Sequence, residues 1–178
     1  MNAFKRGHVE KNYLALVYGK VELNKIQCYG VNSNNGIIEV RIAIGDDAVD
    51  YAHRCSPLFG QDGKKLGNCL NPKLTHTKIK ILEYGNYKGR SCTKILLQPV
   101  TGKRHQLRVV MNYLNHPVVG DRTYGVEDFD SYRTMLHAYK IEINIHKAQL
   151  LTGKAPDPFL NSIDSDWIPH TVVNELNI

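Results

Sequence analysis

Three segments of this chain alternate apolar and polar residues, and this period of two constrains the fold more than any other feature. They are "IIEVRIAI" (37–44), "TKIKIL" (77–82) and "HAYKIEINI" (137–145). Alternation puts every second side chain on one face, as in a half-buried β-strand. The apolar "YLALVYG" (13–19) predicts a buried strand, and "SCTKILLQP" (91–99) predicts the hairpin partner of 77–82. We therefore expect a sheet as the framework.

The period changes once, after a Thr-Gly turn. Leu107, Val110, Met111 and Leu114 are spaced as on one face of an amphipathic helix, and Thr101 is a suitable N-cap for it. Strands, one strong helix and a further strand predict an α+β fold, with a mixed, mostly antiparallel sheet and flanking helices.

The length of 178 residues fits a single domain, 1–178. Residues 46–72 have no sustained period and predict a surface excursion, and the proline-containing 153–178 predicts a surface-wrapping tail. No apolar run approaches the ~20 residues that span a bilayer, so we expect no membrane association. The N-terminal residues lack the apolar core of a secretory signal. We expect an intracellular protein, cytoplasmic by default, with the nucleus and mitochondrion left open.

The formal net charge is +6, which favours an anionic partner. The charge is uneven: nine Lys/Arg and one acid lie between Lys73 and Arg108, whereas nine acids and five Lys/Arg lie from Asp121 to the end. A basic middle of this kind resembles the electrostatic pattern of a nucleic-acid binder. The four cysteines are widely spaced and no set of four zinc ligands has recognisable spacing, so we expect no metal.

The stretch "PVTGKRHQLR" (99–108) gathers much of this charge just before the helical pattern. One interpretation is a solvated helix start. The other is a binding site for a phosphate or a carboxylate, because a turn entering a helix offers free backbone N–H groups. Arg108 falls at the edge between the apolar stripe and solvent, where it can pair with a buried acid from elsewhere in the fold.

The segment "LLQPVTGKRHQLRVVMNYLNHPVVGDRTYG" (96–125) closely resembles the signature of the RluA-type RNA pseudouridine synthases. "KNYLALVYG" (11–19) is similar to the Lys-x-Tyr strand of that family, and "GIIEVRIAIG" (36–45) to the strand that follows it. The tail, together with "LLQPVTG", is most similar to the animal RNA pseudouridylate synthase domain-containing proteins. The resemblance implies isomerisation of uridine to pseudouridine in structured RNA (tRNA or rRNA), on a flipped-out base and with no cofactor.

By matched position, the resemblance implies that Arg108 pairs with the catalytic aspartate and that Tyr13 packs on the target base. Asp121 and Tyr124 would organise a loop. The residues that would contact RNA, support the turn or line the pocket are Lys103, Arg104, His105, Gln106, Leu107 and Val118.

Three departures from the family pattern matter. Lys103 stands where the family has arginine, and Val110 stands where it has histidine. The nucleophile motif His-(Arg/Gln)-Leu-Asp-x-x-Thr-Ser-Gly does not occur in the sequence. We therefore expect the chain to be the C-terminal part of a catalytic domain, inactive alone and prone to self-association. Whether it is a cut-down piece, a partial gene prediction or a natural short form stays open. The alternative function is a non-catalytic RNA-binding module on the same scaffold.

Overall fold

The computed structural model describes residues 9–125, 131–145 and 149–176. Its two helical elements are the 3₁₀ turn η2 (Leu23–Lys25) and the helix α1 (Gln106–Tyr113). The strands are β1 (Val9–Tyr18), β2 (Val31–Asn34), β3 (Ile37–Asp47), β4 (Cys55–Pro57), β5 (Cys69–Tyr87), β6 (Arg90–Pro99), β7 (Leu136–Ile145), β8 (Gln149–Lys154) and β9 (Trp167–Val172).

All nine strands join one sheet in the order β2-β3-β5-β6-β1-β7-β8, with β4 on β3 and β9 on β5. Every pairing in the described part of the chain is antiparallel. The sheet and helix confirm the predicted α+β class. In place of the expected flanking helices, α1 is the single α-helix of the described residues.

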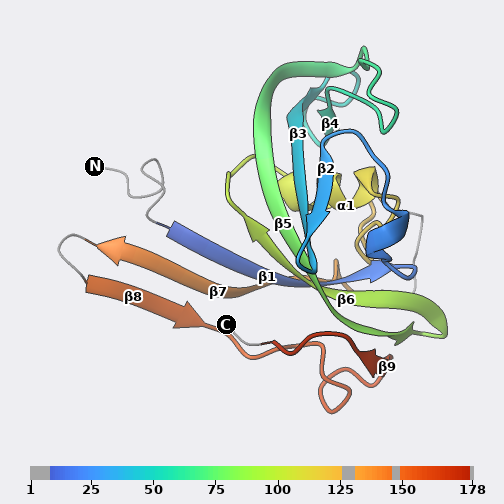
Figure 1. Ribbon diagram of the computed structural model, residues 1–178, viewed down its shortest axis with the longest axis vertical. Helices are drawn as coiled ribbons and strands as arrows, with labels where there is room; N and C mark the ends of the chain where they lie inside the picture. Colours follow the sequence, from blue (N-terminus) through green and yellow to red (C-terminus); the bar gives the residue numbers. More distant parts are fainter. Residues whose placement is uncertain (1–8, 126–130, 146–148, 177–178) are drawn as a thin grey trace.

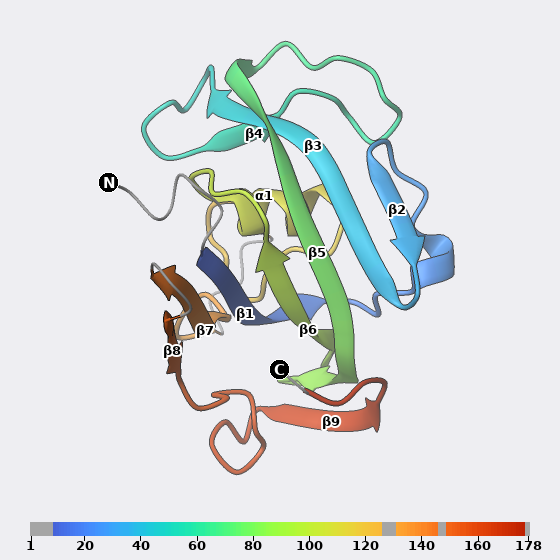
Figure 2. The same ribbon diagram turned by 60° about the vertical axis from the view of Figure 1, so that its left-hand side comes forward.

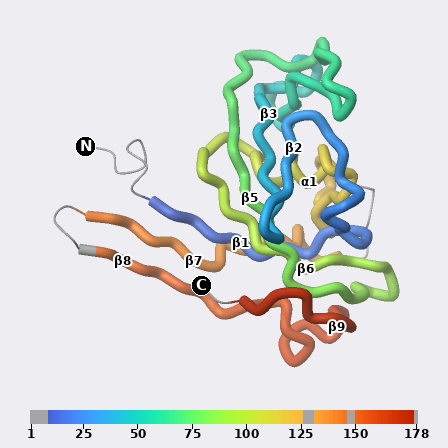
Figure 3. The backbone as a smooth tube through the Cα atoms, in the orientation of Figure 1, coloured from blue at the N-terminus to red at the C-terminus, as the bar shows by residue number. Residues whose placement is uncertain are grey.

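The sheet has two differently oriented parts (Figure 1). β1, β7 and β8 project from the body as an arm, while β2, β3 and β5 stand beside α1. β5 runs along the body, next to β3 over one half and near β9 at its other end (Figure 2). The backbone trace shows β8 returning alongside β7 before the chain crosses to β9 (Figure 3).

The five predicted strands are confirmed as β1, β3, β5, β6 and β7. β5 and β6 form the expected hairpin, and its turn places Lys88 (φ 48°) and Gly89 (φ 77°) in the left-handed region. Two consecutive residues of positive φ match the right-handed twist of the flanking strands. This explains why the strands continue well into "EYGNYKGR".

The expected excursion at 46–72 contains more regular structure than its pattern indicates. β3 extends to Asp47, β4 lies within the excursion, and β5 begins at Cys69. The Asp47 carboxylate accepts hydrogen bonds from the backbone N–H groups of Val49 and Asp50 and from the side chains of Ser56 and Asn68. Hydrogen bonds therefore determine the conformation of this segment. They produce no apolar periodicity, so the sequence pattern could not reveal the segment's structure.

The start of α1 differs from the prediction. The N-cap residue is His105, whose backbone is left-handed (φ 56°), so Thr101 as N-cap is wrong. The Thr101 hydroxyl instead accepts from the His76 N–H at 2.9 Å and donates to Gln106 Oε1 at 3.0 Å. The Lys-Arg pair of "GKR" therefore precedes the helix and lies outside its first turn.

The sheet separates two apolar clusters. Alternate residues of β1 face opposite sides, so Ala15 belongs to the cluster under α1 and Leu14 to the second cluster. Phe159 and Trp167, both fully buried, complete the second cluster. The expected surface tail at 153–178 is therefore anchored, because these two aromatic side chains insert into the core and β9 pairs with β5.

Lys94 lies inside the protein, although lysine side chains are almost never fully buried unless they are paired. Its side chain is 1% exposed. The ammonium contacts Glu83 at 2.9 Å and Asp157 at 2.7 Å, and it donates to the Phe159 carbonyl. Its partners come from distant parts of the chain, so local alternation cannot reveal them.

Neither of the described helices has the length and apolar character needed to cross a membrane.

Candidate active site

A pocket of about 270 Å³ lies where the arm meets the start of α1. We call it the Tyr13–Arg108 pocket. It collects most of the predicted site residues, whereas Arg104 and Val118 are not part of its lining. The lining consists of Lys11, Tyr13, Pro99, Thr101, Gly102, Lys103, His105, Gln106, Leu107, Arg108 and Leu136.

Tyr13 reaches this pocket from β1. Its neighbours across the sheet are Leu97 on β6 and Ala138 on β7, and the register of β1 against β7 shifts between Asn12 and Tyr13. The side chain packs against the cluster under α1 and stays partly exposed. Tyr13 thus forms an aromatic part of the pocket wall, and the contact with a target base that the resemblance implies stays a prediction.

Arg108 forms an ion pair with Asp121 through two hydrogen bonds. Nε lies 2.7 Å from Oδ2 and Nη2 lies 2.5 Å from Oδ1. The Asp121 side chain is fully buried, whereas 21% of the Arg108 side chain is exposed, toward the pocket that it lines. This two-bond geometry fixes the plane of the guanidinium as well as its position. The guanidinium carbon also lies 5.0 Å from the centre of the Tyr124 ring.

This pair confirms one expectation and leaves a second as a prediction. Arg108 does pair with a buried acid from elsewhere in the fold, as its place on the helix predicts. That acid, Asp121, belongs to this sequence, and the pairing of Arg108 with a catalytic aspartate that the resemblance implies stays a prediction. Arg108 nevertheless borders the same pocket as Tyr13.

Arg108 and Asp121 each stabilise the charged form of the other. Burial opposes ionisation of Asp121, but the hydrogen bonds and charge of Arg108, with backbone N–H bonds from Tyr124 and Thr123, outweigh burial and lower its pKa. The hydrogen bond to Asp121 raises the pKa of Arg108 against the opposing effect of burial. Both groups are therefore charged at neutral pH.

Asp121 and Tyr124 organise a loop, as expected. Asp121 Oδ1 accepts from the backbone N–H groups of Thr123 at 3.0 Å and Tyr124 at 3.2 Å. The Tyr124 hydroxyl accepts from the Cys55 N–H at 2.7 Å and lies 2.9 Å from His105 Nδ1. Burial, followed by the neighbouring arginine charges, lowers the pKa of His105, so this imidazole is neutral at pH 7.

Gln106 holds the turn that precedes α1. Its Oε1 accepts from the Thr101 hydroxyl and the Lys103 N–H, and its Nε2 donates to the His76 carbonyl and the Thr77 hydroxyl. The residue is 3% exposed. Its polar atoms are thus used within the fold, and the result is a fixed turn that carries Lys103 at the rim of the pocket.

Two predicted contact residues have other surroundings. The Arg104 guanidinium donates to the carbonyls of Tyr51, Ala52 and Arg54, which ties the turn to the excursion. Val118 is 1% exposed in the core and forms a β-bridge with Val17. Backbone carbonyls and core packing, respectively, occupy these two side chains.

Lys11 belongs to the pocket, and the sequence reasoning did not select it. Its ammonium lies 3.5 Å from the point that a β-carbon on Gly102 would occupy, over the turn that Gln106 holds. It has no hydrogen-bond or ion-pair partner within residues 9–125, 131–145 and 149–176. Lys11 and Tyr13 are two residues apart on β1, so their side chains lie on the same side of the strand. This spacing is the signal that could have identified Lys11 from the sequence.

In the described ranges, no group of three or more His, Cys, Asp or Glu residues is arranged to hold a metal ion.

Comparison with known proteins identifies the family. Residues 1–113 match the family model for RNA pseudouridylate synthase. RNA pseudouridylate synthase domain-containing protein 1 of Danio rerio is 40% identical over 174 residues, which are 97% of this chain and 53% of that protein. Ribosomal large subunit pseudouridine synthase D of Borreliella burgdorferi is 44% identical over 146 residues, 81% of this chain and 36% of that protein.

A solved structure, human RNA pseudouridylate synthase domain containing 1, superposes with a TM-score of 0.82 at 35% identity, covering 98% of this chain and 65% of that one. Human RNA pseudouridylate synthase domain containing 4 has a TM-score of 0.59 at 19% identity, covering 92% of this chain and 62% of that one, and shows the shared fold. The chain spans about half the length of the animal relatives that it matches. It belongs to the RNA pseudouridylate synthase family, as an RluA-type member.

Proposed function

We propose that this chain forms the RNA-facing part of a pseudouridine synthase active site, and that the Tyr13–Arg108 pocket receives the flipped-out uridine of a structured tRNA or rRNA. The observation that carries the proposal is the meeting of Tyr13 and the ion-paired Arg108 in one pocket of about 270 Å³. The reaction breaks the bond from ribose C1′ to uracil N1 and forms one from C1′ to C5; the C5 proton leaves to solvent and N1 takes up a proton. No co-reactant is needed.

The lining suits an unstacked base. Tyr13 offers an aromatic face, and Leu107 and Leu136 add apolar surface that excludes water. Stacking on an aromatic side chain offsets part of the cost of taking a base out of an RNA helix. Lys11 and Lys103 line the same pocket and attract the phosphates on either side of the base.

The remaining edge of Arg108 is suited to a second carboxylate. Asp121 takes Nε and Nη2, and no acceptor among the described residues bonds Nη1. In our proposal, Asp121 is a positioning residue that aims the guanidinium. The nucleophilic aspartate comes from outside these 178 residues and pairs with Nη1, which keeps it ionised.

The test measures tritium released from RNA that carries [5-³H]uridine. We expect no release by the 178-residue chain alone, and release by a longer protein that also carries the His-x-Leu-Asp-x-x-Thr-Ser-Gly motif. In that longer protein, Arg108→Ala should abolish turnover with a modest loss of RNA binding. The control is Arg41→Ala, which removes an exposed arginine paired with Glu39. Turnover by the chain alone would overturn the placement of the nucleophile.

The proposed RNA binding should depend on salt concentration. Affinity should fall steeply with salt, and Lys103→Ala should reduce the slope of log K against log salt by about 0.7 per lost phosphate contact. Because backbone carbonyls hold Arg104, we assign the phosphate contacts to Lys11 and Lys103 instead.

The second candidate is a non-catalytic RNA-binding module. The basic stretch from Lys73 to Arg108, with nine Lys/Arg and one acid, suits such a module as well as a synthase. Reading the coding sequence upstream of Met1 separates the two: an in-frame motif supports the synthase, and a start codon with no motif before it supports the binder. Cytoplasmic location and self-association of the isolated chain remain predictions, to be checked by imaging and by light scattering.

A further inference from the structure

His105 combines a left-handed backbone with a place on the wall of the Tyr13–Arg108 pocket. Its φ is 56°, and it is the N-cap residue of α1. Glycine and asparagine adopt this conformation more readily than residues with larger side chains. The backbone therefore does not explain why a histidine stands at this position, and its side-chain contacts have to.

Hydrogen bonds determine which nitrogen of the His105 ring carries the proton. The Tyr124 hydroxyl accepts from the Cys55 N–H at 2.7 Å and lies 2.9 Å from His105 Nδ1. No other acceptor among the described residues bonds this hydroxyl, so its hydrogen is donated to Nδ1. A neutral imidazole carries a single N–H, which is then on Nε2. The two rings meet edge to face, with their centres 5.7 Å apart.

The Nε2–H group of His105 is free to bind a ligand. It has no hydrogen-bond partner within residues 9–125, 131–145 and 149–176, and it is accessible to solvent. The ammonium groups of Lys11 and Lys103, which line the same pocket, suit phosphates. An uncharged N–H suits a carbonyl oxygen of a base, because this pairing buries no unpaired charge.

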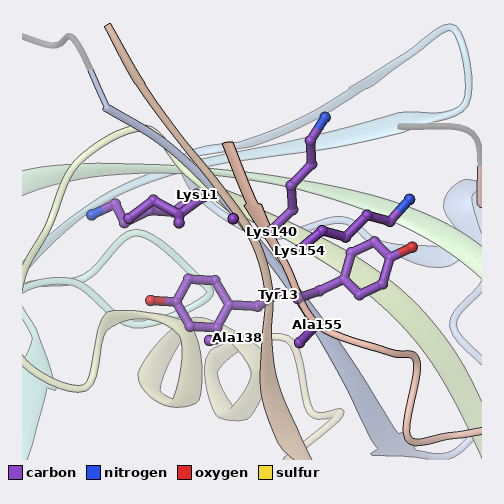
Figure 4. Close-up of a pocket in the computed structure, with 9 residues that line it drawn as sticks. Lys11, Tyr13, Ala138, Lys140, Lys154 and Ala155 are labelled. Carbon is purple, nitrogen blue, oxygen red and sulfur yellow. The ribbon is translucent and has the colours of Figure 1, made fainter. Parts of the chain in front are cut away.

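The neighbouring pocket on the arm, of about 370 Å³, has no comparable set of converging donors. Lys11 pairs with Ile141, and Ile141 pairs with Gly153, so Lys154 lies on the opposite face of the arm from Lys11. Figure 4 shows the side chains of Lys11 and Lys154 extending to opposite sides. The Tyr13–Arg108 pocket is therefore the better place to read a base.

We propose that His105 donates a hydrogen bond from Nε2–H to a carbonyl oxygen of the target uracil, O2 or O4, and so helps the pocket to select this base. This inference rests on the proposed function, since it needs the uridine in this pocket. Both carbonyl oxygens belong to the base edges by which a flipped base is read. The Cys55 N–H and Tyr124 act as positioning groups, since they hold the ring.

The choice of oxygen decides what the pocket rejects. Cytosine has an amino group, a donor, where uracil has O4. A hydrogen bond from His105 to O4 therefore discriminates against cytidine, because two donors would meet. A hydrogen bond to O2 fixes the orientation of the base without separating the two pyrimidines.

The test uses fluorescence anisotropy with the 178-residue chain and a labelled single-stranded RNA that carries one uridine. Two further RNAs carry 2-thiouridine or 4-thiouridine at that position, because sulfur is a weaker acceptor than oxygen. The natural chain should bind at least one thiouridine RNA about three- to tenfold more weakly than the uridine RNA, the size of one hydrogen bond.

His105→Asn removes Nε2–H and keeps the rest of the arrangement. Asparagine tolerates the left-handed backbone, and its side-chain oxygen can accept from the Tyr124 hydroxyl in place of Nδ1. The variant should lose about three- to tenfold in affinity for the uridine RNA and should bind the weakened thiouridine RNA as well as the uridine RNA. Its thermal midpoint checks the fold. The matched control is His170→Asn, at an exposed histidine on β9.

Equal weakening of all three RNAs by His105→Asn, or no change in any affinity, would overturn the inference. So would a long-range proton–nitrogen correlation spectrum of the natural chain that places the imidazole proton on Nδ1. An RNA with an abasic ribose in place of the uridine separates the two proposals. If it binds as tightly as the uridine RNA, the pocket holds no base and the proposed function itself is refuted.

Discussion

Replacing Asp121 by Asn removes the charge that holds Arg108 while leaving the side-chain shape almost unchanged. The carboxylate is fully buried and accepts four hydrogen bonds, two from Arg108 and two from backbone N–H groups. Asn can keep one oxygen acceptor, but its amide group faces a guanidinium donor. The result is a cation without its counter-charge in a largely buried place.

Breaking a buried ion pair from one side costs about 3–5 kcal/mol. Because one fifth of the Arg108 side chain reaches solvent, we expect the lower part of this range or slightly less, about 2–3 kcal/mol. For a domain of this size, that lowers the melting temperature by about 4–12 °C. Urea and thermal unfolding followed by circular dichroism measure both quantities. Asp62→Asn serves as the control, since it makes the same charge change at an exposed carboxylate paired with Lys64.

The pH dependence of protein stability tests independently whether the ionised Asp121 stabilises the fold. The pKa of Asp121 is lower in the folded protein than in the unfolded chain. Its contribution to stability is therefore complete above the unfolded value of about 3.9, and it is lost as the pH falls through the folded pKa. The stability difference between the natural chain and Asp121→Asn should be constant from pH 7 to 5 and narrow below pH 4. Other carboxyls with lowered pKa, such as Asp47, titrate in both proteins.

Two results would refute this reasoning. One is a loss of stability no larger than that of Asp62→Asn. The other is additivity in the double-mutant cycle of Asp121→Asn with Arg108→Gln, since two groups in direct contact should couple by more than about 0.5 kcal/mol.

Two further predictions concern the second cluster. Lys94→Met should cost about 3–5 kcal/mol in urea unfolding, because it leaves Glu83 and Asp157 without their shared cation; an unchanged midpoint would contradict the buried network. Trp167→Ala should cost about 3–5 kcal/mol by opening a cavity and should make residues 155–176 the first site of limited proteolysis, whereas cleavage elsewhere first would contradict an anchored tail.

The strands could be predicted because their signal is local. Alternation along 37–44, 77–82 and 137–145 follows from the geometry of a strand with one buried face, and it needs no knowledge of the partner strand. The helical period after the Thr-Gly turn is local in the same way. The predicted N-cap failed because a left-handed residue, His105, moved the start of α1 to Gln106, and no apolar period records such a change.

The placement of charge could not be predicted, because it depends on residues that are far apart in sequence. In the sequence Lys94 resembles a solvent-exposed lysine of a strand. In the structure the tail (153–178) covers it and supplies Asp157. Arg104 resembles a phosphate ligand, yet the excursion wraps its guanidinium in carbonyls. In both cases a segment without periodic pattern supplies the partners of the cation.

The sequence by itself determined the α+β class, the strand and helix positions and, through the motif around "HQLR", the family. Tertiary structure alone decided that Asp121 neutralises Arg108, that Gln106 builds the turn, and that Lys11 lines the same pocket as Tyr13. The physical reason is range: side-chain periodicity is set by neighbouring residues, whereas an ion pair or a pocket exists only after distant segments pack together.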